Sequence, residues 1–551
     1  ISTLPEPPDG RQNDGFARTI AADDPATPRP AGGGRSRPGD PGPDKVLPKV
    51  SDSDRTPAAD ADGKKAFGRT YWMLNGIEMF ERLAYFSVRA VVPVYIMQAD
   101  DPGGLHFTAA MKGTIYAWWF VFQSILPTFT GGYADRYGYK KTLFVSVTMN
   151  IIGYLMMANL RTYPGFFAGV IVLASGTALF KPSLQGSLAQ NLTKKNSSVG
   201  WGIFYWVVNI GAAIGPFMAT AILGDPHTQA SWRTLFTASA IITGLNYLML
   251  FTFRDVPSGA DKTENPAQVM VRTLKNIVEP RLVTWLLIMS CFWLMMYQLW
   301  DLHPNFIEDW VDSSHIASML PFDQWRIDTT RGVMVPQQIL LNLNAIFIIL
   351  FMVPISWLVR RMRVLECMVI GMAVATGGIL VAGFTGNGWI LLLGIVFFST
   401  GEMMTGPKKN EYLGLIAPAG KKALYLGYVN IPVGIGGFVG SKMAGHLYGH
   451  YGEKATLALK YLAEHTPFGA DKNWNGSVDA LESALGVSRT EAVIKMQEVT
   501  GLDAVEVTDL LWTTYSPQYH VWIPFACIGV AAIVALIIFA QMAKRWADMD
   551  A

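Results

Sequence analysis

The sequence has few charged residues and few cysteines for its length. Only 16% of its 551 residues are Asp, Glu, Lys or Arg, and 51% are hydrophobic, whereas soluble globular proteins are about 25% charged. The three cysteines, Cys291, Cys367 and Cys527, all lie in apolar runs, which argues against a disulfide framework or a metal cluster. The net charge of +2 gives no indication of a nucleic-acid partner. The composition therefore excludes an ordinary soluble domain.

Aromatic residues are almost missing from the first 65 positions, where Phe16 is the exception. This stretch is rich in Pro, Gly, Asp, Arg and Ser, and it cannot bury enough apolar area to offset the entropy lost on ordering. We therefore predict a disordered tail over residues 1–66.

Long apolar runs fill most of the remaining chain. A helix needs about 20 such residues to cross a bilayer. Twelve candidate spans lie near residues 70–98, 111–133, 142–160, 164–192, 200–222, 234–253, 283–311, 336–359, 364–385, 388–416, 424–449 and 519–542. The pattern predicts an all-α membrane protein with twelve transmembrane helices and the lipid bilayer as its solvent.

Basic residues divide the loops into two classes. Lys and Arg follow the even-numbered spans, whereas the loops 99–109 and 386–387 contain neither. Because cytoplasmic loops are enriched in Lys and Arg, both termini are expected in the cytoplasm. We expect a multi-pass protein of the plasma membrane, with a bacterial inner membrane as the favoured location.

The spans divide into two sets of six. We predict an N-terminal six-helix bundle over 67–253 and a cytoplasmic linker over 254–280. A second six-helix bundle covers 281–449 and 519–545, and an extracytoplasmic insertion covers 450–518. Two such halves match the architecture of the major facilitator superfamily, in which the substrate site lies between the halves.

The first span carries charges where lipid is expected. Its polar residues Glu78, Glu81, Arg82, Tyr85 and Arg89 are spaced by three and four, so they share one helix face. A charge at the bilayer centre costs about 3 kcal/mol on insertion scales. We predict a proton switch, in which protonation of Glu78 or Glu81 frees Arg82 or Lys181 to find another partner. A static ion pair that fixes helix packing is the alternative.

Several motifs resemble the proton-dependent oligopeptide transporter family, also called the peptide/nitrate transporter family. Glu78-x-x-Glu81-Arg82 followed by Tyr85 resembles its helix 1 signature. The other matching stretches are GTALFKPSLQGSLA (176–189), FYWVVNIGAAIGP (204–216), LNLNAIFII (341–349) and GEMMTGP (401–407). In addition, GGYADRYGYKKT (131–142) resembles the superfamily's cytoplasmic loop motif, where Asp135 and Arg136 would brace the helix ends against each other; ordinary cytoplasmic charge is the alternative.

The resemblance implies roles for individual residues. Arg89 and Lys181 would form a cationic end for a substrate carboxylate, and Glu402, Asn209 and Asn344 would bind an ammonium group. The family's activity would then be proton-coupled symport of di- and tripeptides by alternating access, with no cofactor required. The partners would be protons and short peptides. An enzyme is not expected, because no nucleophile–base pair or cofactor loop is recognisable.

Three departures from the family pattern affect the predicted substrate. Tyr297 occupies the family's acidic position on helix 7, and we predict that Asp301, one turn further on, replaces it by gating against Arg89. A helix-end carboxylate without this role is the alternative. The family's helix 2 tyrosine falls at Ser124, and KKNEYL (408–413) places charges where the family has small or apolar residues. A carrier of another small anion or of a modified amino acid therefore remains an alternative.

The insertion contains a twelve-residue pattern typical of a calcium loop. Gly476 holds its sixth position. The candidate ligands are Asp471, Asn473, Asn475, Ser477, Asp479 and Glu482. A turn-rich loop without metal is the alternative reading, and a calcium-binding membrane sensor without transport is an alternative function.

Overall fold

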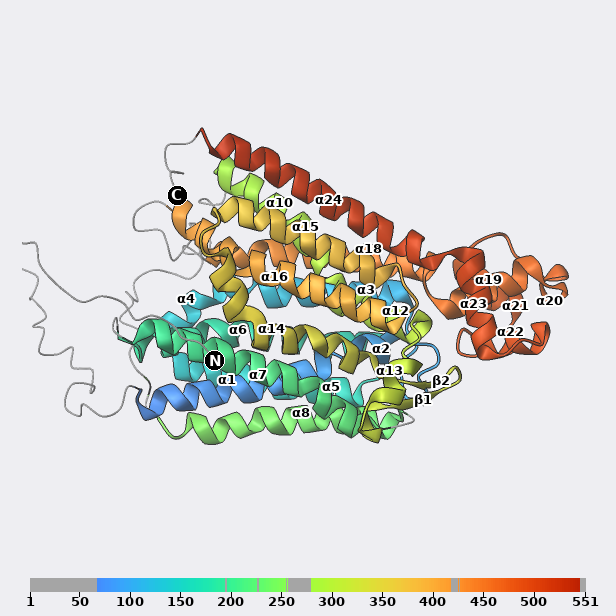
Figure 1. The fold of residues 1–551 in the computed structure, drawn as a ribbon. Helices are drawn as coiled ribbons and strands as arrows, with labels where there is room; N and C mark the ends of the chain where they lie inside the picture. The colour runs from blue at the N-terminus through green and yellow to red at the C-terminus, as the bar shows by residue number, and fades with distance from the viewer. Residues whose placement is uncertain are drawn as a thin grey trace, which may run out of the picture. The chain divides into compact units, whose positions relative to one another are not determined.

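The computed structural model describes residues 67–545 apart from 194–195, 225–226, 254, 256–278, 418–424 and 426. The predicted tail and nearly all of the predicted linker thus lie outside the described residues. The described chain is almost entirely helical (Figure 1). Within it, the one sheet is a hairpin of β1 (Ile327–Thr329) and β2 (Gly332–Met334), in which Ile327 pairs with Met334.

Helices of the first half correspond to the first six predicted spans. They are α1 (Arg69–Arg89), α2 (Val92–Met97), α3 (Ala109–Phe120), the π-helical turn η2 (Val121–Ile125), α4 (Pro127–Tyr137), α5 (Tyr139–Asn159), α6 (Tyr163–Gln190), α7 (Ser197–Leu223) and α8 (Gln229–Leu250). Within this half, α1 packs against α7 and α8, and α5 packs against α6 and α8.

Helices of the second half correspond to the other six spans. They are α10 (Pro280–Met296), α11 (Gln298–Asp301), α12 (His303–Trp310), α13 (Ser314–Met319), η3 (Asp323–Trp325), α14 (Gln337–Val359), α15 (Val364–Gly383), α16 (Gly388–Ile416), η4 (Tyr428–Asn430), α18 (Ile431–Tyr451) and α24 (Pro517–Ala543). Here α15 packs against α16 and α24, and α10 packs against α18 and α24.

Helices α3 and α18 join the two halves, as do α7 and α14. The α3–α18 contact is close enough to require glycine. A Cβ on Gly113 would lie 2.5 Å from the carbonyl oxygen of Ser441, and one on Gly445 would lie 2.6 Å from that of Ala109. Small residues of this kind let two helices in a membrane approach backbone to backbone.

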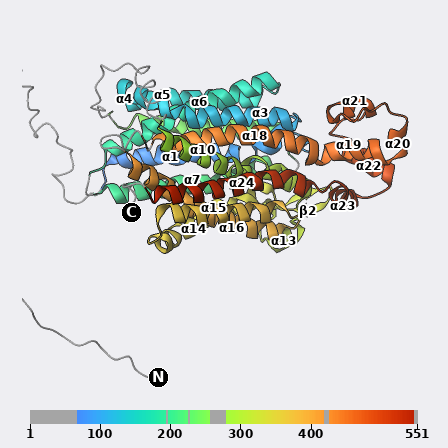
Figure 2. The same cartoon turned by 90° about the horizontal axis from the view of Figure 1, so that it is seen from above.

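The predicted insertion forms a group of short helices beyond one end of the bundle (Figures 1 and 2). They are α19 (Lys454–His465), α20 (Pro467–Ala470), η5 (Val478–Ala480), α21 (Leu481–Leu485), α22 (Ala492–Thr500) and α23 (Ala504–Tyr515). Helix α19 packs against α20, α21, α22 and α23. We call this side of the bundle the insertion end; α1 begins and α24 ends at the opposite end (Figure 1).

Eight of the described helical segments are long and apolar enough to cross a membrane. They correspond to predicted spans 3, 4, 5, 7, 8, 9, 10 and 12. The other predicted spans are also helical, but α1 carries the charged cluster, the second span is interrupted, and α8 and α18 contain many polar or small residues.

Three predicted spans are broken, which corrects their expected continuity. A proline ring clashes with the carbonyl four residues before it. Pro93 therefore ends α1 at Arg89. Pro127 begins α4, and the residue four positions before it, Gln123, lies inside the π-helical turn. The seventh span is interrupted at Tyr297 and again at Leu302, just before Pro304. Each break places polar backbone or side chains at the interface between the halves.

Candidate functional site

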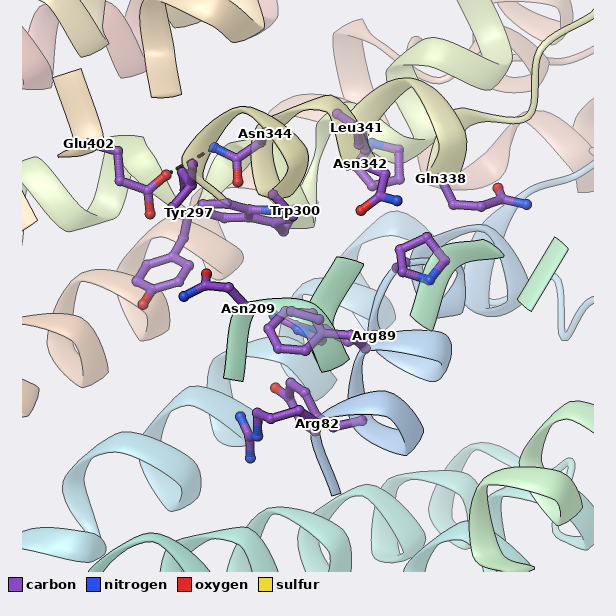
Figure 3. A pocket seen from close by; sticks show the side chains of 18 of the residues that line it. Arg82, Arg89, Asn209, Tyr297, Trp300, Gln338, Leu341, Asn342, Asn344 and Glu402 are labelled. Atoms are coloured by element: carbon purple, nitrogen blue, oxygen red, sulfur yellow. Dashed lines mark hydrogen bonds between the residues drawn. The ribbon is translucent and has the colours of Figure 1, made fainter. Parts of the chain in front are cut away.

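A cavity of about 310 Å³ lies between the two halves (Figure 3). Its size falls at the small end of ligand pockets, which span roughly 300–1,000 Å³. The predicted site residues that line it are Arg82, Tyr85, Arg89, Lys181, Asn209, Tyr297, Asn344 and Glu402. They come from six helical segments far apart in the sequence, so the structure brings together the residues that the motifs singled out.

Arg82 separates the two acids of helix α1 from this cavity. Its Nε lies 2.5 Å from Oε2 of Glu81 and 3.3 Å from Oε1 of Glu78. All three side chains are buried, but only Arg82 lines the cavity. Lys181 is close enough to interact electrostatically with both acids. The acids therefore lie behind Arg82, and a change in their protonation would reach the cavity through Arg82 or Lys181.

Arg89 is held by aromatic rings. Its guanidinium carbon lies 4.0 Å from the ring centre of Tyr116, 4.6 Å from that of Trp119 and 5.2 Å from that of Phe120. Cation–π contacts position an arginine without using its N–H donors, and Nη1 makes no hydrogen bond to a described residue. Arg89 can therefore offer donors to a carboxylate in the cavity.

Gln123 is a cavity residue that the sequence analysis missed. Its Oε1 accepts a hydrogen bond of 2.8 Å from the hydroxyl of Tyr85. Gln123 lies in the π-helical turn η2, a type of turn that is frequent at functional sites. The neighbouring Ser124, which we had aligned with the family's tyrosine, is buried and does not line the cavity. Pro127, four residues on, was the available signal.

The acidic side of the cavity is formed by Glu402 and Asn344. Asn344 Nδ2 donates to Oε2 of Glu402 at 3.0 Å (Figure 3). It also donates to the hydroxyl of Ser399 at 3.0 Å. Lys409, two helical turns after Glu402, interacts with it electrostatically and lies 4.2 Å from the ring centre of Trp293. The negative charge of Glu402 is therefore partly balanced by a lysine of the same helix.

Asn209 and Tyr297 complete the lining without contacting the acidic pair directly by hydrogen bonds. Asn209 donates to the backbone oxygen of Tyr205 at 2.8 Å. The ring of Tyr297 packs 4.7 Å from that of Phe120 and 5.3 Å from that of Trp293. Tyr297 thus fills the family's acidic position with an aromatic contact between the halves.

Asp301 forms no ion pair with Arg89 in this conformation, although the two side chains interact electrostatically. Its Oδ1 lies 2.8 Å from Nζ of Lys112, and its Oδ2 accepts a hydrogen bond of 2.5 Å from Ser441. Asp301 and Lys112 are both buried. The aromatic rings already hold Arg89, whereas Lys112 points from α3 toward the break after α11. Asp301 is therefore paired with Lys112 across the two halves, and its gating role stays a prediction.

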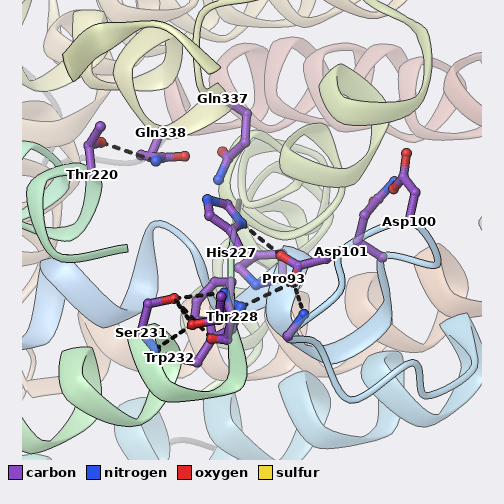
Figure 4. Close-up of polar contacts among 12 residues, drawn as sticks. Pro93, Asp100, Asp101, Thr220, His227, Thr228, Ser231, Trp232, Gln337 and Gln338 are labelled. Carbon is purple, nitrogen blue, oxygen red and sulfur yellow. Dashed lines mark hydrogen bonds and ion pairs between the residues drawn. The ribbon is translucent and has the colours of Figure 1, made fainter. Parts of the chain in front are cut away.

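Hydrogen bonds between the two halves gather at the insertion end. Gln98 donates to Asp309 at 2.8 Å, and Asn305 donates to the carbonyl of Pro93 at 3.1 Å. Gln338 donates to Thr220 at 3.0 Å (Figure 4). Figure 4 also shows the buried Asp101, which anchors the loop after α2 through His227 and Trp232. These contacts hold the two halves together at the insertion end.

The superfamily loop motif ends α4. The side chain of Asp135 lies outside the described residues. The guanidinium carbon of Arg136 lies 5.9 Å from the ring centre of Tyr137. The bracing role of Asp135 and Arg136 stays a prediction.

The predicted calcium loop is exposed at every candidate ligand. Gly476 has φ +86°, as the sharp turn of such a loop requires. The carbonyl of Ser477 accepts a hydrogen bond from the Trp474 indole at 2.8 Å, and Oε1 of Glu482 accepts one from the backbone N–H of Arg489 at 2.6 Å.

Oδ1 of Asn475 also accepts a hydrogen bond, from the backbone N–H of Ser477 at 3.0 Å, so three of the candidate ligands bond to protein donors. Nowhere in the described part of the chain do three His, Cys, Asp or Glu side chains converge as a metal site. Calcium binding stays a prediction. The sequence analysis missed Arg489, whose backbone N–H would compete with a calcium ion for the Glu482 carboxylate.

Known proteins with similar sequences are transporters. The chain is 27% identical over 201 residues to the uncharacterized transporter YclF of Bacillus subtilis, a match that spans 34% of this chain and only 39% of that protein. It is 21% identical over 392 residues to the multidrug resistance protein MdtH of Baumannia cicadellinicola, covering 70% of this chain and 85% of that one.

Solved structures with the same fold are transporters as well. The nucleoside transporter NupG superposes with a TM-score of 0.62 at 12% identity, over 85% of this chain and 99% of that one. A peptide transporter POT in complex with sulfate superposes with a TM-score of 0.59 at 15% identity, over 86% and 94%. The family model of the Major Facilitator Superfamily matches residues 76–441, about two thirds of the sequence. The chain is a helical membrane transporter that belongs to the major facilitator superfamily.

Proposed function

We propose that this transporter is a proton-coupled symporter of di- and tripeptides that works by alternating access. The observation that carries the proposal is the polarity of the central cavity. Arg82, Arg89 and Lys181 line one side of it, and Glu402 with Asn344 lines the other. A chamber with a cationic and an anionic pole is complementary to a short zwitterion.

Proton coupling is proposed from the group around Arg82. Two buried carboxylates share one guanidinium, and Oε1 of Glu81 makes no hydrogen bond to a described residue. Protonation of Glu81 would weaken its hold on Arg82, which could then turn toward a substrate carboxylate. A proton and a substrate would thereby be bound in the same step, which is the requirement for symport.

Orientation follows from the same proposal. The insertion end would face the outside, and both termini would lie in the cytoplasm, as the distribution of Lys and Arg predicts. The hydrogen bonds at the insertion end would then form the closed outer gate.

The test is uptake of labelled dialanine into proteoliposomes, with the interior more alkaline than the exterior. We expect accumulation that collapses when a protonophore is added, and competition by unlabelled dipeptides but not by single amino acids. Lys181→Gln should abolish it, whereas Lys460→Gln, on the insertion helix α19, is the matched control. Absence of any pH-driven flux, combined with calcium-dependent binding of a partner protein, would favour the sensor function instead.

A second candidate, a carrier of another small anion or a modified amino acid, is favoured by one observation. Lys409 interacts with Glu402, so the anionic pole already has a cation beside it, and Tyr297 supplies no acid in compensation. The multidrug and nucleoside carriers among the similar proteins also keep the substrate class open. Stronger competition by acidic dipeptides or free anions than by dialanine would support this candidate.

A further inference from the structure

A second cavity lies at the insertion end. Its volume of about 310 Å³ equals that of the central cavity. Its walls come from three parts of the chain: the loop after α2, the end of α12 with the β1–β2 turn, and the insertion helices α19 and α22. The polar residues among its lining are Gln98, Asp100, His106, Asp309, Thr330, Glu453, Lys454, Arg489, Thr490 and Gln497.

Lys454 is the exceptional residue of this cavity. It is the first residue of α19, and it is only 5% exposed. Its ammonium group makes no hydrogen bond or ion pair with any residue that the structure describes, whereas the buried Arg82 and Lys112 and the partly buried Arg489 are each paired with a carboxylate. Burial and the nearby Arg331 lower the pKa of Lys454, and the opposing effect of Asp100, Asp309 and Glu308 is smaller.

The acids close to Lys454 are committed to other donors. Asp309 accepts hydrogen bonds from Gln98 at 2.8 Å, from the hydroxyl of Tyr448 at 2.5 Å and from the backbone N–H of Lys454 at 3.2 Å. Glu453 is held by Arg489 and by Thr456. Asp100, Asp309 and Glu308 attract Lys454 electrostatically, but none of them forms an ion pair with its ammonium group. Lys454 is therefore a buried cation beside the cavity without a hydrogen-bonded partner, which is unfavourable.

We propose that this cavity binds a second substrate molecule through its carboxylate on Lys454, and that this molecule holds the insertion end closed. The inference rests on the proposed function for the identity of the ligand, a short zwitterion. Equal cavity volumes allow one compound to fill both sites. Asp100, which interacts electrostatically with Lys454, is the counterpart for the ammonium group.

A ligand in this cavity would hold the insertion end closed, because the walls of the cavity belong to different parts of the protein. Gln98 belongs to the first half, and Asp309 and Lys454 belong to the second. Opening the insertion end would break the Gln98–Asp309 hydrogen bond and separate these walls. A ligand that binds only the closed state shifts the equilibrium toward that state. Uptake should therefore decline at high external peptide concentration.

The binding test uses the full-length protein with an impaired central site. Purified Lys181→Met protein is titrated calorimetrically with dialanine, and then the double variants carrying Lys454→Met or Lys460→Met are titrated. We expect dialanine to bind the Lys181→Met protein, and the Lys454→Met change to weaken this binding about tenfold or more, since a charge-assisted hydrogen bond is lost. The Lys460→Met control on the same helix should leave it unchanged.

Ligand variants define the chemistry. N-acetyl-dialanine, which keeps the carboxylate, should still bind, whereas dialanine amide should not. Equal or tighter binding of inorganic phosphate or chloride would overturn the proposal, because it would identify an inorganic anion site. Binding that is insensitive to Lys454→Met would overturn it too.

Two further measurements separate a ligand site from a structural lysine and from a failed substrate assignment. In the absence of ligand, Lys454→Met alone should melt at or above the wild-type temperature, since an unpaired charge is removed; a lower melting temperature would assign Lys454 a structural role and overturn the proposal. In proteoliposomes, Lys454→Met should abolish the decline in uptake at high dialanine. If wild-type protein transports no dipeptide yet binds dialanine through Lys454, the proposed function fails while the outer site stands.

Discussion

Arg82 lies between two carboxylates, so a single proton changes the net charge of these three side chains from −1 to 0. With both acids ionised the group is anionic and holds its guanidinium; with one acid protonated the pair is neutral. Because the three side chains are buried, no solvent charge masks this change.

Glu81→Gln mimics the protonated acid permanently. We expect pH-driven accumulation of dialanine to fall at least about tenfold, since proton binding no longer changes the hold on Arg82, while exchange of dialanine across the membrane at equal pH continues. The measurement is uptake and counterflow in proteoliposomes. Glu366→Gln, an exposed acid paired with Arg363 at 3.7 Å, serves as control. Full pH-driven accumulation by Glu81→Gln would refute the switch.

Lys409 is the residue most able to set substrate charge. Lys409→Met removes the cation beside Glu402 and makes the cavity less positive. We expect competition by acidic dipeptides to weaken several-fold and competition by lysine-containing dipeptides to strengthen. Lys408→Met is the matched control, because Lys408 pairs with Glu411 at 2.9 Å instead. An unchanged ranking of competitors would rule out this role.

At this scale the sequence predicted well the residues that lie on one helix or in a motif. Spacings of three and four put Glu78, Glu81 and Arg82 together. It did not predict partners that depend on tertiary packing: the Gln123 contact with Tyr85, the rings around Arg89 and the Lys112–Asp301 pair all join separate helices.

Single helices were harder to predict than single residues. The apolar run at 283–311 reads as one span, yet the chain turns at Tyr297 and Leu302. Hydropathy averages over such breaks, whereas the clash of a proline ring with the fourth preceding carbonyl is local. Proline alone would not have located the interruptions, because Pro182, Pro216, Pro354, Pro407 and Pro524 lie inside continuous helices.

Calcium binding by the insertion can be tested with Tb³⁺. Trp474 lies inside the loop, so its indole can sensitise the luminescence of bound Tb³⁺. We expect a saturable signal that Ca²⁺ displaces and that Glu482→Gln weakens at least about tenfold, since a bidentate ligand is lost. Asp509→Asn, on α23, is the control. No Tb³⁺ signal at millimolar concentration would exclude a calcium site.

Over the whole molecule, the contacts between the halves at the insertion end join residues 118 to 212 positions apart in sequence. Two halves of six spans could be predicted from hydropathy and loop charge. Which end is closed could not, because it depends on a balance between two packings of the same helices.

The buried Lys112–Asp301 ion pair also joins the two halves. Removing one partner of a buried pair costs about 3–5 kcal/mol, and here only the closed state pays it. We therefore expect Asp301→Asn to shift the population toward an open insertion end.

Spin labels at the exposed Gln229 and Ser318, one on each half, would report this shift as a longer distance by double electron–electron resonance. Combining Asp301→Asn with Lys112→Met should restore much of the closed population, since no unpaired charge remains. An unchanged distance distribution in Asp301→Asn would show that the pair does not bias the equilibrium.

The wide turn at Val121–Ile125 has a consequence for chain length. Each residue advances an α-helix by about 100°. The extra residue in the π-helical turn therefore decides which face of α4 packs against the neighbouring helices. Thr130, whose hydroxyl bonds to the carbonyl of Ala178 at 2.9 Å, would point elsewhere if a single position were deleted from this turn. Insertions and deletions of one residue, harmless in a loop, are therefore prohibited in the middle of this membrane helix.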